Sequence, residues 1–179
     1  MDRRRPPANA ALAGGTPAVH KSRLPLHDLP QFASSLPPTG ALLGLDPGEK
    51  RIGMAVSDAS RTIGSAIEAV TRTKFAADAA QVFTLYDNRA CAGVIVGLPL
   101  NMDGSAGPAA QSARAFARNL VALRDVPVLL WDERLTTAAV TRTLLEGDAS
   151  RRRRGEVIDK MAAAYMLQGA LDALAERLV

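Results

Sequence analysis

The chain has 179 residues, and its 47% apolar and 22% charged residues are close to the average for globular proteins. This length fits one domain of ordinary size. The single cysteine, Cys91, excludes a disulfide framework and a cysteine-rich zinc site. No apolar run approaches the ~18 residues that a membrane-spanning helix needs. No apolar stretch follows the basic start of the chain, so we expect no secretory signal and a cytoplasmic location.

The net charge of +4 lies mostly in the first 39 residues, which carry five basic and two acidic side chains. The remainder is nearly neutral, so the overall charge is a weak argument for nucleic-acid binding. Seven of the 11 prolines also fall in the first 40 residues, where no periodic apolar pattern is present. We therefore predict a disordered, proline-rich basic extension over 1–39, in which 24–32 can dock, and one folded domain over 40–179.

Three strands are predicted at the start of this domain. Residues 41–46 are a short apolar run, residues 51–57 alternate between two faces, and residues 63–70 follow a polar turn. From Phe75 to Tyr86 the apolar residues recur at helical spacing. The domain thus opens with a sheet of hairpins and continues into a helix.

Two further strands, each preceded by a helix, are predicted next. Residues 93–98 and 126–131 are continuous apolar runs, typical of strands buried on both faces. Pro108 marks the first turn of the helix between them. The remaining predictions are a helix capped by Thr136 or Thr137 and ended by Gly147, a basic loop over 151–154, and a last helix over about 156–177.

This order predicts an α/β fold with a mixed sheet, in which functional sites gather at the carboxyl ends of the strands. Asp46 ends the first predicted strand, and Asp132 and Glu133 end the last. Asp159 shares a face of the last helix with small apolar side chains. Each acid also has an ordinary explanation, as a residue that leads a strand into solvent or begins a helix.

If Asp46, Glu133 and Asp159 converge, they need a cation, because three carboxylates within a few ångströms cannot all stay ionised without one. Oxygen ligands suit Mg²⁺ or Mn²⁺. Two such ions can activate a water and stabilise the leaving oxygen of a phosphodiester. Flanking cations can hold neighbouring phosphates, and these are Lys50, Arg51, Arg134 and the arginines at 151–154.

Four segments in this order resemble one family. They are residues 45–58 (LDPGEKRIGMAVSD), 96–105 (VGLPLNMDGS), 132–137 (DERLTT) and 158–163 (IDKMAA). Over about residues 41–175 the chain resembles the YqgF (RuvX) family, described as pre-16S rRNA nucleases and Holliday-junction-resolvase-like proteins. The resemblance implies a ribonuclease-H-like mixed five-stranded sheet flanked by helices.

The resemblance further implies that Asp46, Glu133 and Asp159 are the catalytic, metal-binding acids. Related resolvases carry an acid on the strand that is 94–97 here, where this chain has none, and Glu133 on the next strand can substitute for it. The loop 99–107 lies on the same predicted edge. The expected substrate contacts are Lys50, Arg51, Asn101, Ser105, Arg134, Arg153 and Arg154.

The leading hypothesis is a divalent-metal-dependent endonuclease that processes the 5′ end of pre-16S rRNA during ribosome biogenesis. Its partners would be structured RNA and ribosomal precursor particles, with no membrane. One alternative is a resolvase of Holliday junctions or other branched DNA. The other is an RNA-binding or transcription factor without catalysis.

Overall fold

The computed structural model describes residues 26–135 and 151–177, with side chains described for 26–135 and 161–177. Five strands form one sheet in the order β3-β2-β1-β4-β5. Strands β1, β2 and β3 are antiparallel, whereas β4 and β5 run parallel to β1. The strands are β1 (Ala41–Pro47), β2 (Arg51–Ser57), β3 (Gly64–Thr71), β4 (Cys91–Leu98) and β5 (Val128–Asp132).

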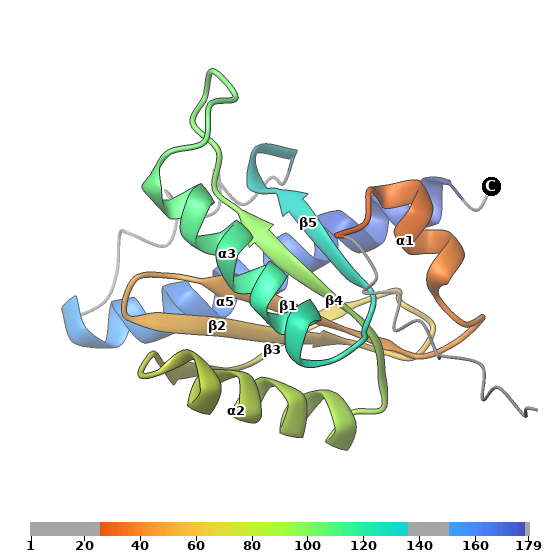
Figure 1. Ribbon diagram of the computed structural model, residues 1–179, viewed down its shortest axis with the longest axis horizontal. Coiled ribbons are helices and arrows are strands. Elements are labelled where there is room, and N and C mark those ends of the chain that lie inside the picture. Colours follow the sequence, from red (N-terminus) through yellow and green to blue (C-terminus); the bar gives the residue numbers. More distant parts are fainter. Residues whose placement is uncertain (1–25, 136–150, 178–179) are drawn as a thin grey trace, which may run out of the picture.

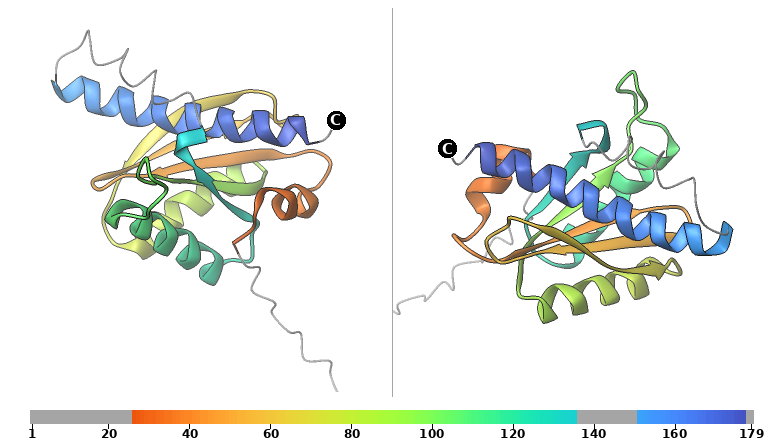
Figure 2. Two further views of the ribbon diagram at one scale, coloured as in Figure 1. Left: turned by 90° about the horizontal axis from the view of Figure 1, so that it is seen from above. Right: turned by 180° about the vertical axis from the view of Figure 1, so that it is seen from behind.

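Helices cover both faces of the sheet (Figure 1). Helices α2 and α3 lie on one face, and α5 crosses the other face diagonally (Figure 2). The helices are α1 (Leu29–Ser35), α2 (Phe75–Asn88), α3 (Pro108–Leu123) and α5 (Arg151–Glu176), and a 3-10 turn, η1 (Glu133–Leu135), follows β5. The predicted ribonuclease-H-like class, a mixed five-stranded sheet flanked by helices, is confirmed, and no strand end differs from prediction by more than two residues.

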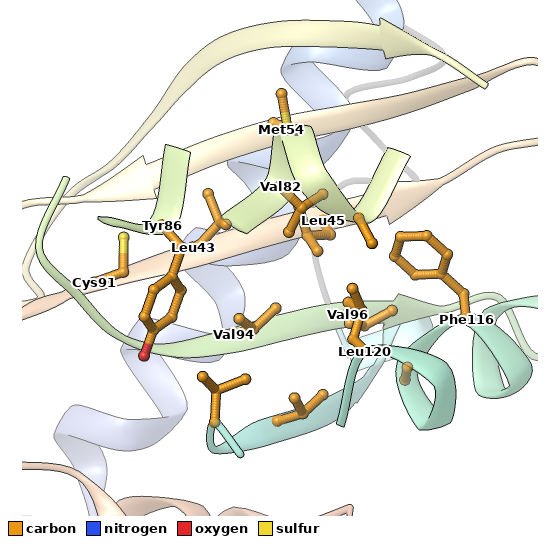
Figure 3. Packing of buried hydrophobic residues seen from close by; sticks show 14 of the residues in the cluster. Leu43, Leu45, Met54, Val82, Tyr86, Cys91, Val94, Val96, Phe116 and Leu120 are labelled. Atoms are coloured by element: carbon orange, nitrogen blue, oxygen red, sulfur yellow. The ribbon is translucent and has the colours of Figure 1, made fainter. Parts of the chain in front are cut away.

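The alternation of side chains along the central strands builds two cores. Leu43 and Leu45 of β1 are fully buried on the face of α2 and α3, together with alternate residues of β4 (Figure 3). Leu42 is buried on the other face against α5, where Leu167 is also fully buried. Each central strand is therefore apolar on both sides, and polar residues of these strands stand only at their ends.

Residues 26–39 are folded, so the predicted docking within 24–32 is observed from Leu26 to Phe32, whereas disorder predicted for the rest of 26–39 is wrong. Asp28 caps α1, because its Oδ1 accepts a hydrogen bond from the Gln31 amide at 2.9 Å, and the Asp28 amide donates one to Gln31 Oε1 at 3.3 Å. Phe32 is fully buried in the α5-side core. The backbone N–H of His27 donates to the Val128 carbonyl at 2.9 Å. This capped turn overrides the proline-rich composition, while residues 1–25 lie outside the described residues.

Helix α5 begins at Arg151, so the basic loop predicted over 151–154 is wrong. Arginine is a good helix former, and Gly155 does not interrupt the helix. The helix predicted up to Glu146 lies outside the described residues, as do the side chains of Arg153 and Arg154. None of the helices in the described part of the chain is both long and apolar enough to cross a membrane.

Candidate active site at the carboxyl edge of the sheet

Asp46 lies at the carboxyl end of β1, on the face that α5 covers. A Cβ on Gly44 would contact the Leu167 side chain of α5 at 3.0 Å. Because side chains alternate along a strand, Asp46 stands on the same face as Gly44. The pairing of Asp46 with Gly53 of β2 keeps the strand regular to this point. The end of β1 therefore presents a half-buried carboxylate toward the α5 side of the sheet.

Glu133 extends from the end of β5 over the neighbouring strand β4. Its Oε1 atom is buried and lies 2.5 Å from where a Cβ would stand on Gly97. Gly97 shares a strand face with Gly93, whose Cβ would contact Phe32 of the α5-side core at 2.9 Å. The Glu133 carboxylate therefore lies on the α5 side of β4, in the space that the missing side chain of Gly97 leaves.

Gly97 also lies next to both acids. Val96 of β4 pairs with Leu45 of β1, so Gly97 is one residue beyond that pair, beside Asp46. Adjacent strands are about 4.8 Å apart. Asp46 and Glu133 thus flank one glycine, on the same face and at the same edge of the sheet.

Asp159 is carried by α5, which packs over this face. It precedes Ala163, Met166 and Ala170 by four, seven and eleven residues, and all three are buried against the sheet. This spacing predicts that Asp159 lies on the sheet-facing stripe of the helix. Its side chain is outside the described side chains, so the predicted convergence of three acids stays a prediction.

Asp132, the other acid at this edge, is engaged by Arg134. The two form an ion pair at 2.6 Å, and the Arg134 amide and Nε both donate to Asp132 Oδ1 at 3.0 Å. These hydrogen bonds hold the pKa of the Asp132 carboxyl below its usual value. Of the two acids that end β5, Glu133 is the one whose carboxylate lies on the same face of the sheet as Asp46.

The loop 99–107 continues β4 beyond this edge. The predicted contact residues Asn101 and Ser105 bond to each other, since Asn101 Nδ2 donates to Ser105 Oγ at 2.8 Å. The Ser105 hydroxyl donates to Asp103 Oδ1 at 2.6 Å, and this bond lowers the pKa of Asp103. Arg134 reaches the same loop, where its Nη1 donates to the Met102 carbonyl at 3.4 Å.

The turn between β1 and β2 carries the predicted cations Lys50, which is exposed, and Arg51, which begins β2 and is half-buried. Arg72, which the sequence analysis missed, braces this turn from the end of β3. Its Nη1 donates to the Gly48 carbonyl at 2.8 Å, and its amide donates to the Lys50 carbonyl at 2.9 Å. No sequence pattern marks Arg72, because its role follows from the β2–β3 pairing.

Among the side chains that the structure describes, there is no cluster of three acidic, histidine or cysteine residues that could hold a metal ion. The donors at this edge are carboxylate oxygens, which suit a hard divalent cation.

Gly97 is the second residue that sequence reasoning missed. An isolated glycine within the aliphatic run of β4 was an available signal of a close approach.

A family model described as RuvX, Holliday junction resolvase, matches residues 40–173. The chain belongs to the RuvX family. Among curated relatives, a Rhodospirillum rubrum protein is 57% identical over 152 residues, covering 84% of this chain and 94% of that protein. A Paracoccus denitrificans protein is 58% identical over 143 residues, covering 80% and 90%. Both bear the provisional name pre-16S rRNA nuclease.

Solved structures similar to this RuvX chain include T. thermophilus RuvC in complex with a Holliday junction substrate, with 16% identity and a TM-score of 0.49. That match covers 78% of this chain and 96% of RuvC. The yeast mitochondrial Holliday junction resolvase Ydc2 has 15% identity and a TM-score of 0.48, covering 83% and 85%. The predicted family and its nuclease class are confirmed by the RuvX match and the names of the relatives.

Proposed function

We propose that this RuvX protein is a divalent-metal-dependent endonuclease that processes the 5′ end of pre-16S rRNA. The observation that carries the proposal is the position of Asp46 and Glu133 on either side of Gly97, at one edge and on one face. The names of the relatives support the RNA substrate. The protein would then act in the cytoplasm, on structured RNA within ribosomal precursor particles.

The side chains at this edge fit Mg²⁺ or Mn²⁺. Asp46 and Glu133 supply hard oxygen donors, and α5 carries Asp159 on the stripe that faces the same side of the sheet. Carboxylates gathered at one edge of a sheet repel each other, and a bound divalent cation would relieve that repulsion. When bound, such ions act as Lewis acids toward the attacking water and the leaving oxygen.

The remaining residues of the proposed site bind and orient the substrate. Lys50 and Arg51 follow Asp46 in the β1–β2 turn and would hold phosphates beside the cut bond. Asn101 and Ser105 offer amide and hydroxyl groups on the loop 99–107. Arg134 is fixed by Asp132, so its guanidinium is already oriented before the substrate arrives. Arg153 and Arg154, in the first turn of α5, would contact phosphates farther along the strand.

Cleavage assays with matched variants test this proposal. Purified protein is given Mn²⁺ and an RNA fragment that spans the 5′ end of 16S rRNA. We expect cutting that chelator abolishes and that Asp46→Asn lowers by at least about 1,000-fold, as for loss of other essential catalytic groups. Asp125→Asn removes an exposed acid at the opposite edge and serves as the control. Full activity in chelator, or in Asp46→Asn, would contradict the proposal.

Branched DNA is the second candidate substrate, favoured by the description of the family model as a Holliday junction resolvase. The same preparation is assayed on a four-way DNA junction at equal concentration. Faster cutting of the junction than of the RNA would favour the resolvase. Tight RNA binding with no cutting of either substrate would favour a binding factor.

A further inference from the structure

Met102 is the most exposed large apolar side chain in the described part of the chain. Its exposure is 90%, against 60–67% for Ile63, Leu123 and Leu135. It lies in the loop 99–107, which rises from the carboxyl end of β4 (Figure 1). The Met102 side chain therefore contributes little to packing within the monomer, because nearly all of its surface faces water.

Hydrogen bonds within the loop hold Met102 in this exposed position. The Asn101 amide donates to the Ser105 carbonyl at 3.0 Å, and the Gly104 amide donates to the Asn101 carbonyl at 2.8 Å. Gly104 has a φ of +86°, which closes the turn immediately after Met102 and Asp103. The loop is thus ordered before any ligand binds.

The loop apex is tied to the proposed active site. Arg134 Nη1 donates to the Met102 carbonyl at 3.4 Å, and Arg134 follows Glu133 directly in the chain. The loop itself begins two residues after Gly97, which accommodates the Glu133 carboxylate. The loop that carries Met102 is therefore anchored next to the edge that holds Asp46 and Glu133.

The surroundings of Met102 favour a base stack as its binding partner. Its direct neighbours Asn101 and Asp103 are polar, so it offers one apolar side chain, whereas a stable protein interface needs about 800 Å² per partner. One apolar side chain is the size of the wedges that other proteins insert between base steps. The thioether chain is flexible and polarisable, which suits contact with an aromatic ring.

We propose that Met102 inserts between bases at a discontinuity of an RNA helix, such as a bulge or a single-strand junction, and so selects structured sites for cleavage. The inference rests on the proposed nuclease function and names the substrate feature that the site recognises. Unstacking is least costly where a base is already unpaired. Insertion therefore favours an interrupted helix over a continuous one.

Binding measurements in the cleavage-deficient Asp46→Asn background test this assignment. The RNA carries 2-aminopurine beside a bulge, and a continuous duplex of the same length serves as reference. We expect the 2-aminopurine fluorescence to rise when Asp46→Asn or the double variant Asp46→Asn/Met102→Leu binds the RNA. With Asp46→Asn/Met102→Ala, the fluorescence should stay low. We also expect Met102→Ala to reduce the preference for bulged RNA by about tenfold. Ile63→Ala, at the opposite edge of the sheet, is the matched control.

Two results would overturn the assignment. One is an unchanged preference for bulged RNA in Met102→Ala, and the other is an equal loss of affinity for both RNAs, which indicates a general contact or a folding defect. Thermal unfolding of each variant identifies a folding defect. Failure of the nuclease proposal would appear instead as absent or chelator-resistant cleavage by the wild-type chain, so the two failures are distinguishable.

Discussion

Glu133 occupies space on strand β4 that would belong to a side chain if Gly97 were any other residue, with Oε1 2.5 Å from the position of the missing Cβ. Real Cβ atoms do not approach other atoms so closely, so even alanine would displace the carboxylate. The end of β5 thus supplies an acid to β4, which has none of its own. This relationship makes Gly97 a positioning residue of the proposed site.

Gly97→Ala should reduce cleavage by about 100-fold, because small displacements of a catalytic group have effects of this size. The shorter carboxylate of Gly97→Ala/Glu133→Asp should recover part of this loss. Gly107→Ala is the control, since its Cβ would meet its nearest neighbour at an ordinary 3.6 Å. Unchanged turnover in Gly97→Ala would contradict the positioning role of Gly97.

Mn²⁺ should stabilise the protein against unfolding through Asp46 and Glu133. A ligand at 100 times its dissociation constant adds about 2.7 kcal/mol to the unfolding free energy. We expect the melting temperature to rise with Mn²⁺ in the wild type and in Asp125→Asn, and to stay constant in Asp46→Asn and Glu133→Gln. An equal rise in all four proteins would place the ion elsewhere.

Arg72→Ala should loosen the turn that follows Asp46. The substitution removes the hydrogen bond to the Gly48 carbonyl and the stacking of the guanidinium over Phe116 at 5.9 Å. We expect the unfolding free energy in urea to fall by about 1–2 kcal/mol and turnover to fall with it. Arg118→Ala removes an exposed arginine of α3 and should change neither quantity.

Phe32→Ala should destabilise the fold by about 3–5 kcal/mol, the usual cost of removing a buried aromatic side chain. Phe32 packs in the α5-side core, where 0% of its surface is accessible to solvent. Asp28→Ala removes only the cap of α1 and should cost about 1 kcal/mol. Urea unfolding separates these values, and equal midpoints for Phe32→Ala and the wild type would mean that α1 does not pack.

Acid should destabilise the turn between β2 and β3 through Asp58. Hydrogen bonds from the Ser60 hydroxyl and the Ile63 amide lower the pKa of Asp58 from 3.8 to about 2. The unfolded chain therefore takes up this proton first, so the stabilisation is complete above pH 3.8 and is lost as the pH falls toward 2. The difference in melting temperature between wild type and Asp58→Asn should shrink over this range, and a constant difference would contradict this assignment.

The sequence predicts the five strands well because their periodicity is set by burial. β1 and β4 are apolar on both sides, and β2 alternates beside them, so each pattern has one structural interpretation. Helix α1 is missed because its prolines outweigh a short capping signal, Asp28 followed by Gln31. The arginines at 151–154 look like a solvated loop, but arginine also favours helix, and only the structure decides between these readings.

The candidate site is predictable in outline because strand ends are recognisable in the sequence. Asp46 and Glu133 follow apolar runs, so their meeting at one edge can be inferred from a parallel arrangement. The face of the sheet on which the two acids lie, and the distance between them, cannot be inferred from the sequence, since both depend on Gly97 and on the register of β1 with β4. The choice between Asp132 and Glu133 likewise depends on Arg134, whose pairing becomes visible only in three dimensions.

The short segment before α1 has a consequence for self-association. His27 runs parallel to Leu129 and bonds to Val128, so this segment occupies the outer side of β5. Within the described chain, β3 and β5 are the two edge strands, and His27 bridges only the beginning of β5. Two copies that joined their sheets edge to edge at β3 would meet its exposed Glu68, and a charged side chain on an edge strand opposes such a joint.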